Sequence, residues 1–415
     1  MQRDNRSFIR WRWHIVALLY FASLCYLLFQ GGRTAVMLLV ILTALISYLA
    51  LGKWSGIRNV QGDRRISHAG GADGQAVSGT STEVSLTVHV PGYYPLPYVL
   101  VRDRLFRHDG QSIPFETSFV PNWKRSGEVR YTTPPLRRGV YRFGPTECST
   151  RDVFGLFEHS GSFEAGISFS VIPQTVPLRG WQQIRRGLRG PHSHASAPRA
   201  AKETTQINGV REYLYGDKLS RVHWNATAKT GEWKSKAFER ESLPRTIVVL
   251  DRSADAYGIR QERFELAVSV AASLIELGMR RETAMGLVSA GEHATVLPPR
   301  SGTEQRTAMM RHLTVVEPDA AQSLYASLQR LESVWEPGTL VVIVSGAHGD
   351  SIMKAMSWLS RKGVSLSYVG VEELELRGGR QIKTAWLQAL RAKGWSAYSV
   401  RQLHELPAAL EGGAV

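Results

Sequence analysis

The chain has 415 residues, enough for two or three domains, because a single hydrophobic core rarely grows beyond about 250–300 residues. Hydrophobic residues make up 43% and charged residues 21%, which excludes a wholly disordered chain. The net charge of +15 is concentrated in residues 1–65, which carry +7, and in residues 177–240, which carry +8. Two cysteines, Cys25 and Cys148, exclude a disulfide framework and a CxxC metal site.

Residues 1–52 predict a transmembrane helical hairpin. Residues 13–29 and 34–51 are uncharged apolar runs, each close to the roughly 20 residues that cross a bilayer core. A signal peptide is the alternative for the first run, but no small-residue cleavage site follows it and a second run comes at once. A buried hairpin of a soluble protein is the other alternative, although two such runs in tandem are rare outside membranes.

The basic residues near the two runs predict their orientation. Only Arg33 lies in the connecting loop, whereas Arg and Lys gather outside the runs at Arg3, Arg6, Arg10, Arg12, Lys53, Arg58, Arg64 and Arg65. By the positive-inside rule, both termini and residues 52–415 are expected in the cytoplasm. The first half of the basic excess is then a topology signal that also favours anionic lipid.

Two segments follow the hairpin. Residues 53–82 are rich in Gly, Ser and Ala and are expected to form a linker. Residues 83–175 alternate short apolar runs with turn signals such as Pro91-Gly92 and Gly144-Pro145. This pattern predicts a small antiparallel β-sandwich or barrel domain.

The second half of the chain changes character twice. Residues 176–245 form a basic connection that contains a dense charged and aromatic segment, 211–241. Residues 246–415 alternate apolar β-runs with runs of helical period, which predicts a doubly wound α/β domain with a mostly parallel sheet.

The first strand of that domain ends at Asp251, and Ser253 and Asp255 follow it. Ligands of open α/β sheets gather at the carboxyl ends of strands, and oxygen ligands at alternate positions can hold Mg²⁺ or Mn²⁺. Thr303 could add a hydroxyl, but residues 345–346 lack the further carboxylate that would complete the set. The alternative is that Asp251 caps a turn or the next helix and binds nothing. No motif for a nucleophile with its base is present.

The segment 211–241 has two interpretations. Its cations and aromatic residues suit nucleic acid, but the interleaved acids repel phosphate. The favoured interpretation is an internal network, in which Arg211 or Arg221 pairs with Asp217 or a glutamate and Trp224 packs on the sheet. Its exposed remainder would then be a protein-docking surface.

Three stretches together resemble the domain of unknown function 58 family. The first has Arg211, Tyr213, Gly216, Asp217, Arg221 and Trp224 at the positions of the family's R-x-Y-x-x-G-D-x-x-R-x-I-x-W signature. The others are RRGVYRFGP at 137–145 and TRDVFGL at 150–156, where Val153 replaces a proline. The resemblance covers nearly the whole chain.

The resemblance implies a C-terminal domain similar to a von Willebrand factor A domain. Such domains carry a metal-ion-dependent adhesion site of the form Asp-x-Ser-x-Ser with a later Thr and Asp. Asp251 and Ser253 match the first two positions, Asp255 replaces the second Ser, Thr303 is the candidate Thr, and the last Asp is absent. The resemblance also implies two partners, a MoxR-type AAA+ ATPase and a transglutaminase-like membrane protein.

These observations leave three functional hypotheses. The leading one is a non-enzymatic, membrane-anchored cytoplasmic adaptor that works with the MoxR-type ATPase in assembly or maturation of envelope or metal-dependent complexes. The second is a metal-dependent hydrolase or adhesion-type site with Mg²⁺ or Mn²⁺ at Asp251, Ser253, Asp255 and Thr303. The third is nucleic-acid binding through residues 177–240, which ranks last because acids are interleaved with the cations.

Overall fold

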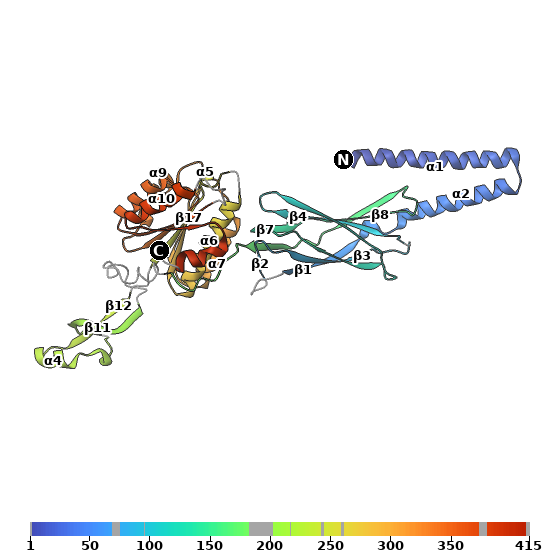
Figure 1. Ribbon diagram of the computed structural model, residues 1–415. Helices are drawn as coiled ribbons and strands as arrows, with labels where there is room; N and C mark the ends of the chain where they lie inside the picture. The colour runs from blue at the N-terminus through green and yellow to red at the C-terminus, as the bar shows by residue number, and fades with distance from the viewer. Residues whose placement is uncertain are drawn as a thin grey trace. The chain divides into compact units, whose positions relative to one another are not determined.

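The computed structural model describes residues 2–68, 75–94, 96–181, 202–215, 217–241, 245–258, 261–372 and 380–411. The chain divides into two compact units, Met1–Ile172 and Pro173–Val415. The first contains two apolar helices and two β-sheets, and the second contains a six-stranded sheet and a separate two-stranded sheet (Figure 1). The chain is therefore a mixed α/β protein with two N-terminal apolar helices, as the sequence predicts.

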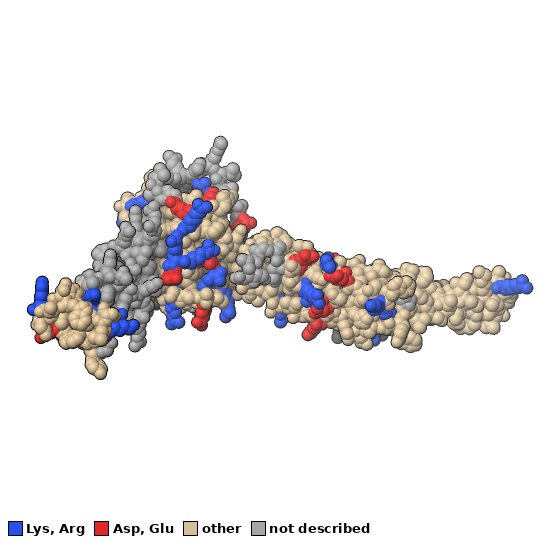
Figure 2. All heavy atoms as spheres, turned by 90° about the horizontal axis from the view of Figure 1, so that it is seen from below, with Lys and Arg blue, Asp and Glu red and all other residues tan. Residues whose placement is uncertain are grey.

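The two N-terminal helices are α1 (Gln2–Gln30) and α2 (Arg33–Leu51). Gly31 and Gly32 turn the chain between them with φ of 64° and 94°, which glycine adopts without strain. Trp13–Gln30 and Arg33–Leu51 are long and apolar enough to cross a membrane. Only 6% and 11% of these two stretches are buried, so neither is a core helix of its unit. Figure 2 shows the visible face of the hairpin without charged side chains except at its tip.

The β part of the first unit consists of two sheets that pack face to face. One has the order β1-β3-β6, and the other has the order β2-β10-β7-β4-β8-β9 with β5 paired to β4. Leu86 of β3 and Val101 of β4 belong to one buried cluster, so the sheets share a core, as in the predicted sandwich. The strands are β1 (Gln61–His68), β2 (Ala76–Val77), β3 (Thr82–His89), β4 (Val99–Arg107), β5 (Ser112–Phe119), β6 (Ser126–Thr132), β7 (Gly139–Phe143), β8 (Thr146–Arg151), β9 (Glu158–Phe163) and β10 (Ser168–Ile172).

Strand β1 corrects the predicted linker 53–82. Residues Gln61–His68 pair antiparallel with Thr82–His89 along their whole length. The strand lacks a clear apolar alternation because its most buried inward side chain is Arg64, a charged residue. A search for alternating hydrophobic residues therefore does not predict strand β1.

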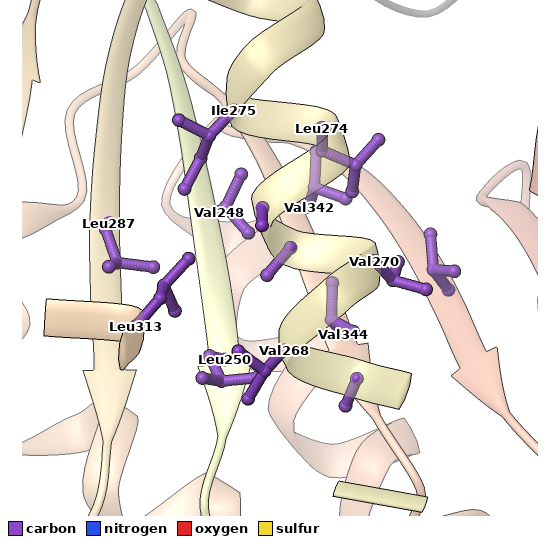
Figure 3. Packing of buried hydrophobic residues seen from close by; sticks show 14 of the residues in the cluster. Val248, Leu250, Val268, Val270, Leu274, Ile275, Leu287, Leu313, Val342 and Val344 are labelled. Carbon is purple, nitrogen blue, oxygen red and sulfur yellow. The ribbon is translucent and has the colours of Figure 1, made fainter. Parts of the chain in front are cut away.

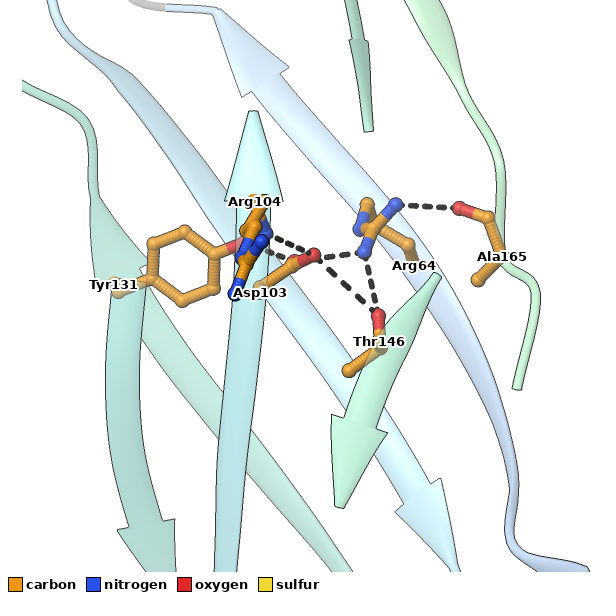
Figure 4. A network of polar contacts seen from close by, with 6 residues as sticks. All are labelled: Arg64, Asp103, Arg104, Tyr131, Thr146 and Ala165. Carbon is orange, nitrogen blue, oxygen red and sulfur yellow. Dashed lines mark hydrogen bonds and ion pairs between the residues drawn. The ribbon is translucent and has the colours of Figure 1, made fainter. Parts of the chain in front are cut away.

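A buried polar network makes that inward arginine stable (Figure 4). Arg64 Nη2 lies 2.7 Å from Asp103 Oδ2 and donates to Thr146 Oγ1 at 2.8 Å. The Tyr131 hydroxyl donates to the same Asp103 oxygen at 2.5 Å. The Arg64 guanidinium also lies 4.0 Å from the centre of the Phe143 ring. Four strands, β1, β4, β6 and β8, are thus joined by hydrogen bonds through the core.

The second unit is built on a sheet of order β15-β14-β13-β16-β17-β18. All its pairings are parallel except that of the edge strand β15 with β14. The five parallel strands match predicted β-runs, whereas β15 was not predicted because Pro298 and Pro299 argue against a strand away from an edge. The strands are β13 (Arg245–Asp251), β14 (Ala284–Ala290), β15 (Thr295–Arg300), β16 (Leu340–Ser345), β17 (Ser365–Val371) and β18 (Ser396–Val400).

Each face of this sheet has its own hydrophobic core. Val248 and Leu250 of β13 pack with α6 on one face (Figure 3), while Ile247 and Val249 pack with α9 on the other. The alternation follows from the two-residue period of a strand. The helices are α5 (Ala254–Tyr257), α6 (Gln261–Arg280), α7 (Thr303–Val315), α8 (Leu324–Gln329), α9 (Asp350–Arg361), α10 (Arg380–Ala392) and α11 (Leu406–Glu411).

The predicted connection 176–245 is more ordered than expected at both ends. Leu178 and Trp181 are buried in the α6-side core, and Trp181 Nε1 donates to the Tyr398 hydroxyl at 3.3 Å. Further on, β11 (Lys202–Glu212) and β12 (Lys234–Glu241) pair antiparallel, with α4 (Trp224–Thr230) between them. We call the described residues of 202–241 the arm. Residues 182–201 lie outside the described ranges.

Candidate functional site

Asp251 lies where the strand order of the six-stranded sheet reverses. The chain places β14 and β15 on one side of β13, and β16, β17 and β18 on the other. Asp251 and Ser345 each follow the paired residues Leu250 and Val344, so they are neighbours at the carboxyl ends of β13 and β16. Open α/β sheets bind ligands at such a switch point. The sequence therefore identified a strand end in the right place for a site.

The carboxylate of Asp251 is buried, with none of the residue exposed, and hydrogen-bond donors surround it. Its Oδ1 accepts from the Ser253 amide at 2.9 Å and from the Ser253 hydroxyl at 2.6 Å. Its Oδ2 accepts from the Ser345 hydroxyl at 2.5 Å, and the amide of Ala347 donates to that hydroxyl at 2.9 Å. Both carboxylate oxygens thus have partners from the protein itself.

Burial dominates the electrostatics of this carboxylate. Desolvation raises the pKa of Asp251, and the hydrogen bonds from Ser253 and Ser345 oppose the shift without cancelling it. The Tyr257 hydroxyl donates to the backbone oxygen of Asp251 at 2.7 Å, and burial raises the pKa of that tyrosine as well. Tyr257 is therefore a neutral hydrogen-bond donor at neutral pH and does not act as a base.

Arg252 holds the loop of residues 317–320 next to the end of β13. Its guanidinium pairs with Asp319, and its Nε donates to Glu317 O at 2.9 Å. The Ala254 amide donates to Ala320 O at 2.9 Å, so the loop runs directly beside Asp251-x-Ser253. Sequence reasoning missed Arg252 and Asp319, because their separation along the chain gives no signal of their contact.

Thr303 does not join the Asp251 site. Asp251 is paired with Ala290 at the end of β14, whereas Arg300 at the end of antiparallel β15 is paired with Met285 near the start of β14. Five residues of strand, roughly 16 Å, separate these two levels. Thr303 begins α7 just beyond Arg300. It therefore lies toward the amino ends of the parallel strands, whereas Asp251 lies at a carboxyl end.

The residues present do not fit the adhesion-type metal site that the family resemblance implies. Ser253 and Ser345 are at Asp251, but their hydroxyls bond to its carboxylate, while Asp255 is exposed in the first turn of α5. Mg²⁺ and Mn²⁺ favour about six oxygen ligands with anionic character. Across the ranges that the structure describes, no group of three or more His, Cys, Asp or Glu side chains is placed to hold a metal ion.

A cavity of about 20 Å³ lies at the ends of β16 and β17, where Gly346, His348, Tyr368 and Glu372 contribute to its lining. Such a volume holds about one water molecule. What Asp251 does here is to tie the ends of β13 and β16 together through Ser345.

The signature residues of the arm form a local network. Arg211 Nη2 donates to Asp217 Oδ1 at 2.7 Å, and the Leu214 amide donates to Asp217 Oδ2 at 3.1 Å. The Tyr213 hydroxyl donates to the backbone oxygen of Asp217 at 2.6 Å. Of the pairings that the sequence left open, the structure shows Arg211 with Asp217. These bonds lower the pKa of Asp217, with the Arg211 bond as the largest cause. Gly216 lies outside the described residues.

The other two signature residues have different surroundings. Ser235 Oγ donates to the backbone oxygen of Arg221 at 3.4 Å, which ties the η3 turn (Leu219–Arg221) to β12. Trp224 is 62% exposed, and its ring centre lies 6.1 Å from that of Trp233 in the same arm. Trp224 therefore packs within the arm and not on the six-stranded sheet, which corrects the predicted packing.

The arm displays several large apolar side chains to solvent. They gather around α4 and the β11–α4 and α4–β12 loops, at Leu214, Tyr215, Leu219, Trp224 and Trp233. None of the described arm residues belongs to the two hydrophobic clusters of the six-stranded sheet. An apolar group of this size on a small hairpin is the kind of surface that another molecule covers.

Comparison with known proteins gives one family and one relative. Residues 209–376 match the family described as "Protein of unknown function DUF58". The chain is 26% identical over 321 residues to "Uncharacterized protein YeaD" of Bacillus subtilis (strain 168), which covers 76% of this chain and 77% of that protein.

Solved structures give only weak likenesses. Proximal thread matrix protein 1 from the mussel byssus has a TM-score of 0.30 at 16% identity, over 41% of this chain and 46% of that one. The CARDB domain of the PF1109 protein from Pyrococcus furiosus has a TM-score of 0.18 at 15% identity, over 27% and 87% of the two chains. These scores assign no fold. The sequence match to the DUF58 family therefore remains the specific finding, and its residues 209–376 run from β11 of the arm to just beyond β17.

Proposed function

We propose that this chain is a non-enzymatic adaptor held at a cell membrane by its N-terminal hairpin. In this proposal the spans place both termini and residues 52–415 in the cytoplasm. The second unit is a von Willebrand factor A-like domain that uses the arm to dock a MoxR-type AAA+ ATPase. The assembly acts in maturation of envelope or metal-dependent complexes, alongside a transglutaminase-like membrane protein.

The exposed apolar group of the arm carries this proposal. Tryptophan and tyrosine dominate binding energy at protein interfaces, and here Tyr215, Trp224 and Trp233 are all exposed on one small element. The Arg211–Asp217 ion pair and the Tyr213 hydrogen bond hold the neighbouring loop in place before any partner arrives. A preorganised loop loses less entropy on binding, which favours affinity.

The complete burial of Asp251 supports an adaptor over an enzyme. A catalytic aspartate needs an approach for substrate and a partner acid or base within reach. Asp251 is instead covered, and its neighbours are serine hydroxyls and two tyrosines whose pKa values are raised by burial. The same geometry favours neither a hydrolase nor metal-dependent adhesion at this strand end.

The charges of the arm favour a protein partner over nucleic acid. Lys234 lies 3.2 Å from Glu232 and 3.8 Å from Glu212, so a cation of the arm is matched by acids nearby. A phosphate backbone would meet these carboxylates as well as the lysine. A protein surface with mixed charges around an apolar centre has no such conflict.

A direct binding measurement tests the proposal. The full chain, purified in mild detergent and immobilised, is titrated with a purified MoxR-type ATPase in ATP with Mg²⁺, in ADP, and without nucleotide. We expect specific binding in at least one of these states. Trp224→Ala and Tyr215→Ala should each weaken it by about tenfold or more, since truncating a hot-spot aromatic costs about 2 kcal/mol or more and each 1.4 kcal/mol is about tenfold.

Trp123→Ala is the matched control, because Trp123 is a fully exposed tryptophan of the first unit. It should leave the affinity unchanged. If the ATPase does not bind in any nucleotide state, or if Trp123→Ala and Trp224→Ala weaken binding equally, the proposed docking role of the arm is refuted.

A further inference from the structure

The β part of the first unit shows its large apolar side chains to solvent at one end only. Among its described residues, those that are exposed lie in three loops, β3–β4, β5–β6 and β8–β9, at Tyr93, Val120, Trp123, Val153 and Phe154. The register places these loops together: His89 pairs with Ser126, Val99 pairs with Phe119, and Leu100 pairs with Ser149 near the end of β8. The turns at the other end carry no exposed large apolar side chain within the described residues.

The same end is where both apolar helices meet the β part. The ring of Trp13, at the start of the first apolar stretch, stacks on Phe157 with centres 4.6 Å apart. Tyr48, near the end of α2, lies 5.7 Å from Tyr94 and 6.2 Å from Phe154, again between ring centres. Trp54, in the short helix directly after α2, is also exposed. The exposed apolar loops therefore surround the base of the hairpin.

Two sets of hydrogen bonds, one made by Asp152 and one by Arg125, fix the conformations of these loops. In the β8–β9 loop, the carboxylate of Asp152 accepts from the amides of Phe154, Leu156 and Phe157 at 2.8, 3.2 and 2.6 Å. This turn lies within the TRDVFGL stretch and leaves Val153 and Phe154 outside.

In the β5–β6 loop, the Arg125 guanidinium donates to the backbone oxygens of Val90, Tyr94 and Ser55. It thus ties two loops to the residue that follows the helices. The apolar tips are presented by ordered loops.

The charge at this end suits a lipid headgroup layer. Lys124 is exposed beside Trp123, and the three loops contain only one acidic residue, Asp152, which is buried. Tryptophan and tyrosine favour the membrane–water interface, where an apolar ring and a polar edge are both satisfied. A groove of about 760 Å³ opens between the β3–β4 and β5–β6 loops, lined by Tyr93, Trp123, Lys124 and Arg125 among others.

We propose that Trp54 and these three loops form a collar that sits in the headgroup layer around the base of the hairpin, so that the β part rests on the bilayer surface. The inference rests on the proposed membrane anchoring. It assigns to the first unit a lipid-contacting surface beyond the two spans, in which exposed Lys124 can meet anionic headgroups.

Spin labels on the full chain test the collar in vesicles of phosphatidylcholine and phosphatidylglycerol. Val153→Cys and Val120→Cys report on the collar, Gln111→Cys on the opposite end of the same sheets, and Leu38→Cys on α2. Cys25→Ser removes the competing thiol, while Cys148 can stay, because burial raises its pKa to about 12 and keeps it unreactive. The measurement is relaxation by oxygen, which concentrates in lipid, against a water-soluble nickel chelate.

We expect the labels at 120 and 153 to collide several-fold less often with the nickel chelate than the label at 111, and the label at 38 to be the most protected. If 38 is protected while 120 and 153 match 111, the helices are anchored but the collar is wrong. If 38 is as accessible as 111, the anchoring itself fails and the collar with it.

Discussion

Asp217 and Asp251 show at the level of single residues how surroundings decide what an aspartate does. Asp217 is near the surface of the arm, and bonds from Arg211 and the Leu214 amide lower its pKa. Asp251 has hydrogen bonds of similar length, yet complete burial raises its pKa. The two carboxylates should therefore affect stability in opposite directions as pH changes.

Asp251→Asn should remove one pH-dependent contribution to stability. A folded-state pKa above the ordinary value of about 3.9 means that the folded protein holds this proton more tightly than the unfolded chain does. The contribution is fully present below about pH 4 and is lost as pH rises through the raised pKa. The wild-type melting temperature should therefore fall relative to that of Asp251→Asn between about pH 4 and neutral pH. Parallel melting curves for the two proteins would contradict the raised pKa, whatever their constant offset.

Asp217→Asn should have the reverse dependence. Its lowered pKa stabilises the arm above about pH 4, near the ordinary aspartate pKa, and this stabilisation is lost as pH falls through the folded value. At neutral pH we expect the Leu214 amide, which donates to Asp217, to exchange its hydrogen faster in the variant. Glu212→Gln is the control, because the Glu212 side chain is 82% exposed and should change this exchange little.

At the level of elements, the sequence predicted what apolar patterning controls. The parallel strands β13, β14, β16 and β17 are apolar runs buried on both faces, so they were found. Strand β1 was not found, because its inward position is Arg64, whose burial depends on a partner 39 residues away. Thr303 was wrongly placed at the site for a related reason. Antiparallel β15 returns the chain to the amino ends of the parallel strands, and β15 was not predicted because it contains two prolines.

The Arg64–Asp103 pair predicts a graded series of stabilities for the first unit. Asp103→Ala leaves a buried guanidinium without its counter-charge and should cost about 3–5 kcal/mol. Tyr131→Phe removes one hydrogen bond to the same carboxylate and should cost about 1.5 kcal/mol. Replacing both charges, with Arg64→Met and Asp103→Leu, should cost less than Asp103→Ala alone.

Denaturant unfolding gives the free energy of unfolding of each variant. Hydrogen exchange of the β1 and β4 amides then shows whether the loss of stability lies in this network. A cost for Tyr131→Phe equal to that for Asp103→Ala would show that the network is held by the tyrosine and not by the ion pair.

For the whole molecule, the base of the hairpin links topology to fold. Trp13 and Tyr48 belong to different helices, and both contact the β8–β9 loop of the same unit, through Phe157 and Phe154. If the helices cross a membrane, the start of the first and the end of the second are then on one side, together with the β part. Arg64 is paired with buried Asp103 and Arg65 lies 3.8 Å from Asp63, so these two cations of the basic cluster after α2 are matched by acids within the β part.

The orientation of the proposed membrane anchor is the last prediction. Alkaline phosphatase fused after Val415 should be inactive in cells, because this enzyme folds only outside the cytoplasm, where its disulfides form. Exchanging Arg3, Arg6, Arg10 and Arg12 for Gln while adding two arginines beside Arg33 reverses the charge difference across the first span. By the positive-inside rule, this variant should move part of the population outward and raise phosphatase activity. The four Gln substitutions alone should have a smaller effect. High activity of the unmodified fusion would place residues 52–415 outside the cytoplasm and would exclude a cytoplasmic ATPase as the partner of the arm.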